Sequence, residues 1–262
     1  MRLEVRTVTA TRYVTPLREG GSLPAIVEAD DDGLYVLKFR GAGQGPKALI
    51  AELVVGEVGR ALGLPVPDIV FVELDAALAG TEPDPEIQDL LKASVGLNLA
   101  LDYLPGSVMF DPLVERLNPE LASSVVWFDA YATNVDRTPR NANMLIWHKK
   151  LWLIDHGAAL YFHHAWTNYR ESSRKAFQQI KDHILLPSAA SLRDVDTNLA
   201  ERLTPEVIND IVNLIPDAWL GTDSLFKSAE ESRHAYADYL LRRLEPPRLF
   251  MEEAERVRAS LV

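Results

Sequence analysis

The feature that most constrains the fold is a change of pattern near Pro105-Gly106, where a strand-rich sequence gives way to a helix-rich one. Before this point, short runs of β-branched and aromatic residues alternate with turn residues, which is typical of strands. After it, apolar residues mostly recur at the three- and four-residue spacing of helices. A turn dipeptide at such a change indicates a boundary between two units. The sequence therefore predicts an α+β protein with one unit over residues 1–104 and another over 105–262.

The first unit is expected to hold four strands and one amphipathic helix. The acidic turn Asp30-Asp-Asp-Gly33 separates two β-prone runs, which indicates a β-hairpin. Gly63 and Pro65 end the apolar periodicity of the helix that follows. The predicted elements are strands over 24–29, 34–40, 69–74 and 95–104, a helix over 47–64, and a surface loop over 75–86.

The second unit is expected to be helical apart from one β-hairpin. Two short apolar runs, 144–148 and 151–155, are joined by Lys149-Lys150, which is a hairpin pattern. A polar loop containing acidic residues lies on each side of this hairpin. The predicted helices span 112–116, 119–133, 170–185, 205–214 and 225–244.

Composition limits the chemistry that is available to the chain. There is no cysteine, which excludes disulfides, zinc–thiolate sites and cysteine nucleophiles. The formal charge of -11 makes direct binding of a nucleic acid unfavourable, because that binding needs a basic surface. No apolar run approaches the ~18–20 residues that span a bilayer, and the first residues lack the apolar core of a signal peptide. We expect a cytoplasmic protein without a membrane partner.

The loops beside the second hairpin carry two candidate catalytic carboxylates, Asp136 and Asp155. Asp136 is followed five positions later by Asn141, and the hairpin ends in Asp155-His156-Gly157. Phosphoryl transfer uses one carboxylate to orient or deprotonate the attacking hydroxyl, and a second that fixes magnesium on the nucleotide together with an amide oxygen. The acid-to-asparagine spacing is shared by protein, lipid and antibiotic kinases, which have Asp-Phe-Gly where this chain has Asp-His-Gly.

Longer motifs around these residues resemble the HipA-like kinase family, relatives of the serine kinase of bacterial toxin–antitoxin modules. They are Asn134-Val-Asp-Arg-Thr-Pro-Arg-Asn-Ala-Asn143, Leu151-Trp-Leu-Ile-Asp-His-Gly157 and Tyr35-Val-Leu-Lys38, and the resemblance extends from Tyr35 to Leu244. It implies a bilobal protein-kinase-like fold that uses ATP and Mg²⁺. It also implies a protein substrate with a serine or threonine acceptor, and an antitoxin-like partner. The chain is much shorter than the full-length toxin kinase.

The resemblance also implies roles for individual residues. Asp136 resembles the catalytic base, Asp155 the magnesium-bridging carboxylate, and Lys38 the strand lysine that contacts the α- and β-phosphates. Asn141 has the expected offset from Asp136, whereas Asn143 directly precedes the hairpin strand, as the family's magnesium asparagine usually does. Both asparagines stay open as the metal ligand, with Asn141 preferred.

Strand alternation adds a residue to the predicted nucleotide site. Val36 lies two positions before Lys38 and must face the same way, so we expect it against the adenine. Lys38 also needs a carboxylate partner, and the following helix offers Glu52 and Glu57. Glu52 is preferred because it is nearer the start of the helix.

Two further segments are expected beside the nucleotide. Backbone groups near Asp102 and Leu104 would form the hinge that hydrogen-bonds the adenine edge. Gly20, Gly21 and Ser22 precede the first hairpin strand, where a glycine loop would cover the phosphates. The family carries a self-phosphorylated serine in such a loop. A phosphate on Ser22 would add about -1.5 to -2 charges beside the ATP phosphates and lower activity.

Other interpretations stay open on the sequence. A small-molecule kinase of the antibiotic-phosphotransferase type uses the same Asp and Asn arrangement, and a nucleotide-binding pseudokinase would act as an interaction module. The pair His163-His164 lacks the spacing that brings two ligands onto one helix face, so no zinc site is expected. A basic cluster offers a surface for an acidic partner: Arg170, Arg174, Lys175 and Lys181.

Overall fold

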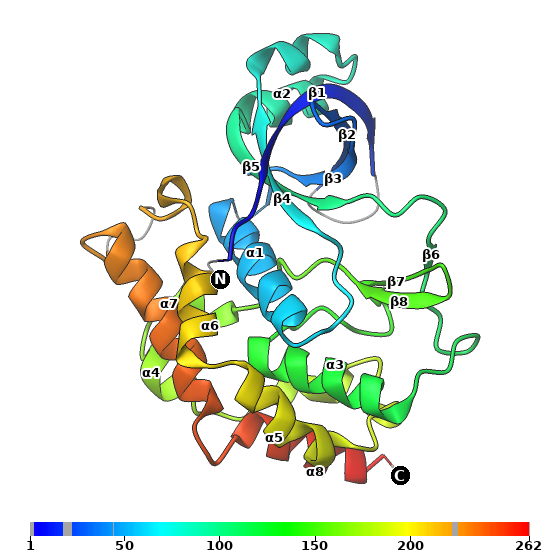
Figure 1. Cartoon of the computed structure of the whole chain (residues 1–262), viewed down its shortest axis with the longest axis vertical. Coiled ribbons are helices and arrows are strands. Elements are labelled where there is room, and N and C mark those ends of the chain that lie inside the picture. Colours follow the sequence, from blue (N-terminus) through cyan, green and yellow to red (C-terminus); the bar gives the residue numbers. More distant parts are fainter. Residues whose placement is uncertain (1–2, 18–22, 44, 222–224, 262) are drawn as a thin grey trace.

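A computed structural model describes residues 3–17, 23–43, 45–221 and 225–261 of the chain. Its N-terminal part is built on a closed barrel of strands, and the rest is mostly helical, as Figure 1 shows. The barrel runs in the order β1-β2-β3-β5-β4. Its strands are β1 (Thr7–Pro16), β2 (Ala25–Ala29), β3 (Leu34–Lys38), β4 (Ile69–Leu74) and β5 (Gly96–Asp102).

The barrel closes because β1 pairs with two neighbours. It runs antiparallel to β2 and parallel to β4, with Thr7 opposite Phe71. Within β3 the side chains alternate, so that Tyr35 and Leu37 are buried in the barrel core while Val36 and Lys38 point to the opposite side. This alternation sets Lys38 outside the barrel core, on the side of the helical part.

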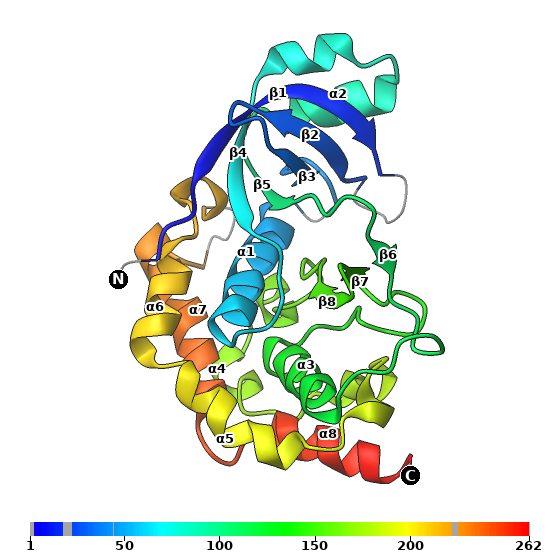
Figure 2. The ribbon, with the colours of Figure 1, turned by 45° about the vertical axis from the view of Figure 1, so that its right-hand side comes forward.

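Helix α1 (Pro46–Ala61) follows β3 and lies beneath the barrel. The sequence predicted an amphipathic helix here, but every residue from Leu49 to Gly59 is buried. The reason is tertiary, because α6 (Pro205–Asn213) and the 3₁₀ helix Asp217–Trp219 pack against α1. Figure 2 shows α1 enclosed between the barrel and the helices of the C-terminal part.

The helical part is organised around α3, whose last three turns are almost entirely buried. A small sheet in the order β6-β7-β8 lies on the side facing the barrel. Besides α6, the α-helices of the helical part are α3 (Pro119–Ala132), α4 (Tyr169–Ser172), α5 (Leu192–Arg202), α7 (Ala229–Leu244) and α8 (Leu249–Ala259). The strands are β6 (Val108–Met109), β7 (Met144–Trp147) and β8 (Lys150–Leu153).

Direct hydrogen bonds join the barrel part to the helical part. Leu153 N–H donates to the Pro65 carbonyl at 2.7 Å, and Trp219 Nε1 donates to the Leu97 carbonyl at 3.2 Å. The Trp219 ring also packs edge-on against Phe71, with ring centroids 5.6 Å apart. These contacts hold the two parts together on the side of α1. No helix in the described part of the chain is long and apolar enough to cross a membrane.

Most predicted elements are confirmed. Both hairpins, the strands near 69–74 and 95–104, and the helices near 47–64, 119–133, 205–214 and 225–244 are present with ends shifted by a few residues. Several elements were not predicted, among them β1, β6, α5 and α8. The helices α5 and α8 are rich in charged residues, and β1 is rich in polar ones, so their apolar residues form no clear period in the sequence.

Three local predictions are wrong. The loop predicted over 75–86 contains a 3₁₀ helix, Ala76–Thr81, and the start of α2 (Pro85–Ala93), each capped by a preceding aspartate side chain. Residues 112–114 form a turn, and residues 115–116 have no regular structure, so no helix is present over 112–116. Residues 170–185 are helical only in α4 and in the 3₁₀ helix Gln178–Asp182. Tertiary bonds override the helical pattern there, since Ile184 N–H donates to the Arg137 carbonyl at 3.1 Å.

Candidate active site

Lys38 is the centre of a cluster of opposite charges between the barrel and the helical part. Its Nζ lies 2.6 Å from Asp155 Oδ1 and 3.4 Å from Glu52 Oε2. The Lys38 and Glu52 side chains are 12 % and 1 % exposed, whereas the Asp155 side chain is 41 % exposed. The buried partner thus holds the lysine, and the exposed partner faces open space.

The pKa values of the buried pair follow from this geometry. Burial by itself lowers the pKa of Lys38, but the carboxylates of Glu52 and Asp155 outweigh burial and raise it above its ordinary value. Burial raises the pKa of Glu52, but the Lys38 ammonium and the hydrogen bonds to the carboxylate lower it to about 2. Both groups are therefore charged at neutral pH.

The structure separates the two glutamates offered by α1. Glu52 contacts Lys38 and also accepts the backbone N–H of His156 at 2.9 Å, which ties α1 to the loop after β8. Glu57 instead pairs with Arg60 on its own helix at 3.5 Å. Glu52 lies about one and a half turns nearer the start of α1 than Glu57 does, and of the two it is Glu52 that contacts Lys38.

Asp136 and both candidate asparagines share one hydrogen-bonded group. Asp136 Oδ2 accepts from Asn141 Nδ2 at 2.7 Å and from Asn143 Nδ2 at 3.1 Å. Asn143 and Asp155 both have left-handed backbone, with φ of 49° and 56°. Non-glycine residues in this region cost energy and gather at functional sites. The amide oxygens of both asparagines stay available for a metal ion, so the geometry does not choose between them.

A cleft of about 600 Å³ lies beside these residues, between the barrel and the small sheet. Val36 and Lys38 line it from β3, as strand alternation predicted. Its other lining residues from the predicted site are Asp102, Leu104, Asn141, Asn143 and Asp155. Apolar residues complete the wall, among them Leu101, Leu145, Ile154 and Met109.

In the predicted hinge segment, two backbone N–H groups are already hydrogen-bonded within the protein. Asp102 N–H donates to the Asp68 carbonyl at 2.8 Å, and Tyr103 N–H donates to the Leu34 carbonyl at 3.0 Å. Among the described residues, Leu104 N–H has no such partner. Leu104 is therefore the hinge residue whose backbone N–H is free to bind a ligand, whereas Asp102 lines the cleft and could offer its backbone carbonyl but not its N–H.

Gly20, Gly21 and Ser22 lie outside the described residues. Two of the four residues of the basic cluster form ion pairs within the chain, since Arg170 pairs with Asp238 and Arg174 pairs with Glu245.

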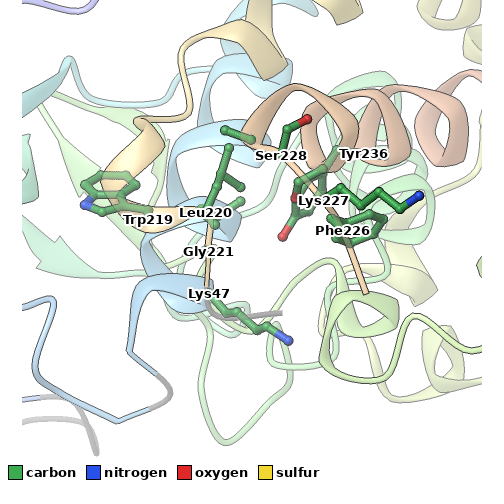
Figure 3. Close-up of a pocket in the computed structure, with 11 residues that line it drawn as sticks. Lys47, Trp219, Leu220, Gly221, Phe226, Lys227, Ser228 and Tyr236 are labelled. Carbon is green, nitrogen blue, oxygen red and sulfur yellow. The ribbon is translucent and has the colours of Figure 1, made fainter. Parts of the chain in front are cut away.

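A second cavity, of about 260 Å³, lies on the other side of α1 (Figure 3). Lys47 and Ile50 line it from α1, and Tyr236 and Ser232 line it from α7. Lys47 Nζ donates to the His163 carbonyl at 2.6 Å. None of the residues predicted from the sequence lines this cavity, so it is separate from the candidate active site.

A buried carboxylate that sequence reasoning missed lies behind the Asp136 loop. Asp129, near the end of α3, is fully buried and pairs with Arg137. Burial raises the pKa of Asp129, but the Arg137 ion pair and the contact with His183 outweigh burial and lower it. Arg137 directly follows Asp136 in the sequence, and this arginine is a local signal that could have indicated a carboxylate partner.

The donor set of the cleft suits a hard metal ion bound to phosphates. The candidate ligands are one carboxylate, Asp155, and the amide oxygens of Asn141 and Asn143, which are oxygen donors of the kind that Mg²⁺ prefers. In the described part of the chain, no group of three or more His, Asp and Glu residues is placed to hold a metal by itself. The residues therefore fit an ion that takes its remaining ligands from a nucleotide and water.

Comparison with known proteins adds independent findings. A family model described as HipA-like kinase matches residues 11–252. The Helicobacter pylori proinflammatory kinase CtkA has a similar structure, with a TM-score of 0.57 at 14% identity over 98% of this chain and 99% of that chain. The Golgi casein kinase with Mn and ADP bound gives a TM-score of 0.55 at 11% identity over 97% of this chain and 74% of that chain. No curated protein sequence matches.

Proposed function

The chain belongs to the HipA-like kinase family, and we propose that it is an ATP- and magnesium-dependent kinase that phosphorylates a serine or threonine hydroxyl of a protein. The observation that supports this proposal most is that residues far apart in the sequence come together at one cleft. Lys38 and Asp155, 117 positions apart, meet there with Asn141 and Asn143, and both asparagines donate to Asp136. A structural role for any one of these residues would not require the whole set.

We take the barrel part and the helical part as the two lobes of a kinase, divided at residues 104 and 105. ATP would lie in the cleft between them, with the adenine against Val36 and Leu101 and its edge at the Leu104 N–H. Lys38 would bind the α- and β-phosphates. The Golgi casein kinase structure holds Mn and ADP, which supports a nucleotide and a divalent cation for this fold.

Magnesium would be held by Asp155 and by Asn141 or Asn143, and it would neutralise charge on the phosphates. The direct pair between Lys38 and Asp155 would then loosen, because each group gains a partner of opposite charge. Glu52, buried beneath the lysine, would keep Lys38 in place during this exchange.

Asp136 would act on the acceptor and not on the nucleotide. Its carboxylate would orient the hydroxyl and take its proton as the hydroxyl oxygen bonds to the γ-phosphorus. The bond between that phosphorus and the β,γ-bridging oxygen breaks, and ADP leaves. Asn141 and Asn143 would hold Asp136 Oδ2, which leaves Oδ1 directed at the acceptor.

Incubation with γ-labelled ATP and Mg²⁺, alone and with cell extract, tests the proposal. Label on serine or threonine of a protein, absent with the Asp136→Asn variant, is the expected result. Label only on a small molecule would replace the protein acceptor by a metabolite, the activity of an antibiotic-phosphotransferase-like kinase. No transfer under any condition would contradict a kinase function and favour a nucleotide-binding interaction module.

A further inference from the structure

The carboxylate of Asp129 gathers three donors at the point where α3 ends. Arg137 Nε donates to Oδ2 at 2.6 Å, and Asn134 Nδ2 donates to Oδ1 at 2.8 Å. His183 Nε2 lies 2.9 Å from Oδ2. All four side chains are buried. One carboxylate thus joins a helix, the loop that carries Asp136 and a segment almost fifty residues later.

Two of these donors, Asn134 and Arg137, flank Asp136 in the sequence and connect it to Asp129. Asn134 Oδ1 accepts the Asp136 backbone N–H at 3.1 Å, so the amide that Asp129 holds in turn holds the backbone of Asp136. Arg137, the next residue, is fixed by its ion pair to Asp129. The backbone on either side of Asp136 is therefore anchored to the same buried carboxylate.

The network also reaches the metal side of the cleft. Arg137 Nη1 donates to the Asn143 carbonyl, and the same carbonyl accepts the Ile154 backbone N–H at 3.0 Å. Ile154 directly precedes Asp155. A chain of contacts therefore leads from Asp129 through Arg137 to both segments that carry the candidate metal ligands.

The third donor, His183, has a defined tautomer. Its Nδ1 accepts the Leu185 backbone N–H at 3.0 Å, so the ring proton is on Nε2 and points at Asp129. The Arg137 carbonyl accepts the Ile184 N–H beside it. Residues 183–185 therefore pack onto the Asp136 loop through directional hydrogen bonds, and Arg137 forms an ion pair with Asp129.

We propose that Asp129 is a positioning residue that sets the places of Asp136 and Asn143 through Asn134 and Arg137. The proposal rests on the proposed kinase function, because it concerns the site where that reaction would occur. Asp129 is fully buried and does not line the cleft, so it would contact neither nucleotide nor acceptor. A displacement of about 1 Å in a reacting group can reduce a rate about 100-fold, so the loss of such an anchor acts on turnover.

The test compares Asp129→Asn with a matched control, Asp196→Asn. Asp196 is also a buried aspartate, and it accepts from Trp127 Nε1 and from Arg248. Among the hydrogen bonds of the described residues, none joins Trp127 or Arg248 to the Asp136 loop. We expect the Asp129 variant to lose about 100-fold in turnover at saturating ATP, while its affinity for ATP without magnesium is unchanged. The Asp196 variant should keep wild-type turnover per folded molecule.

A double variant separates positioning from folding. Asp129→Leu with Arg137→Met removes both buried charges and leaves an apolar pair, which keeps such sites folded. It should unfold cooperatively and still show low turnover, because Asn134 and the Asn143 carbonyl have lost their anchor. Wild-type turnover in this variant, or in Asp129→Asn, would overturn the proposal.

Amide hydrogen exchange gives a readout that does not depend on activity. The N–H groups of Asp136 and Ile184 should exchange faster in Asp129→Asn than in the wild type, and Asp196→Asn should leave them unchanged. Unchanged exchange at both groups in Asp129→Asn would also overturn the proposal. Absence of phosphate transfer by the wild type would instead contradict the kinase function, and the exchange result would still decide the role of Asp129.

Discussion

Lys38 Nζ lies 2.6 Å from Asp155 Oδ1, although 117 positions of sequence separate the two residues. The same ammonium lies 3.4 Å from the buried Glu52 carboxylate. One cation therefore connects β3, α1 and the loop after β8, and these three elements cannot move independently while the cluster is intact. Substitutions in this cluster should consequently affect both stability and function.

Lys38→Met should lower both the free energy of unfolding and the turnover. The variant leaves Glu52 buried without its cation, a change that typically costs about 3 kcal/mol. Urea unfolding measures this loss. The double variant Lys38→Met with Glu52→Gln should recover most of the stability and none of the turnover. A Lys38→Met protein as stable as the wild type would contradict the buried-pair interpretation.

Asp136→Asn should reduce phosphate transfer at least about 100-fold, because a general base is lost. The asparagine side chain still accepts hydrogen bonds from Asn141 and Asn143, so the loop should keep its shape. ATP affinity, measured by calorimetry, is expected to stay within the error of the wild-type value. A loss of affinity as large as the loss of rate would place Asp136 on the nucleotide.

Asp155→Ala should weaken nucleotide binding mainly when magnesium is present, since the variant removes a carboxylate ligand of the ion. Without magnesium the affinity should rise or stay level, because Lys38 is freed from its 2.6 Å pair. Titrations with ATP in magnesium and in EDTA measure both cases. Equal magnesium dependence in variant and wild type would exclude Asp155 as a ligand.

Acid should destabilise the protein in part through Glu52. Its pKa is lowered from 4.5 to about 2 in the folded state, so it contributes stability that is complete above pH 4.5 and is lost as the pH falls towards 2. Between these pH values the free energy of unfolding should fall less steeply for Glu52→Gln than for the wild type. Glu73→Gln, an exposed change on β4, is the control and should follow the wild type.

Local patterns were sufficient where neighbours in sequence decide the structure. The hairpin of β7 and β8 and the five-residue offset from Asp136 to Asn141 depend only on short-range spacing, and the structure shows the hairpin and the hydrogen bond at that offset. Alternation along β3 likewise predicted that Val36 and Lys38 share a face. The prediction of a helix over 170–185 is wrong because the apolar pattern carries no information on the tertiary hydrogen bonds of Ile184 and His183.

The sequence by itself determined the order of most elements, the family and the residue types available for phosphate transfer. Only the tertiary structure decided that Glu52 and not Glu57 meets Lys38, that α1 is buried on all sides, and that Asp129 lies behind Asp136. The physical reason is that these facts depend on contacts between distant segments. Such contacts are selected by packing and by the need to pair buried charges, and neither leaves a periodic signal along the chain.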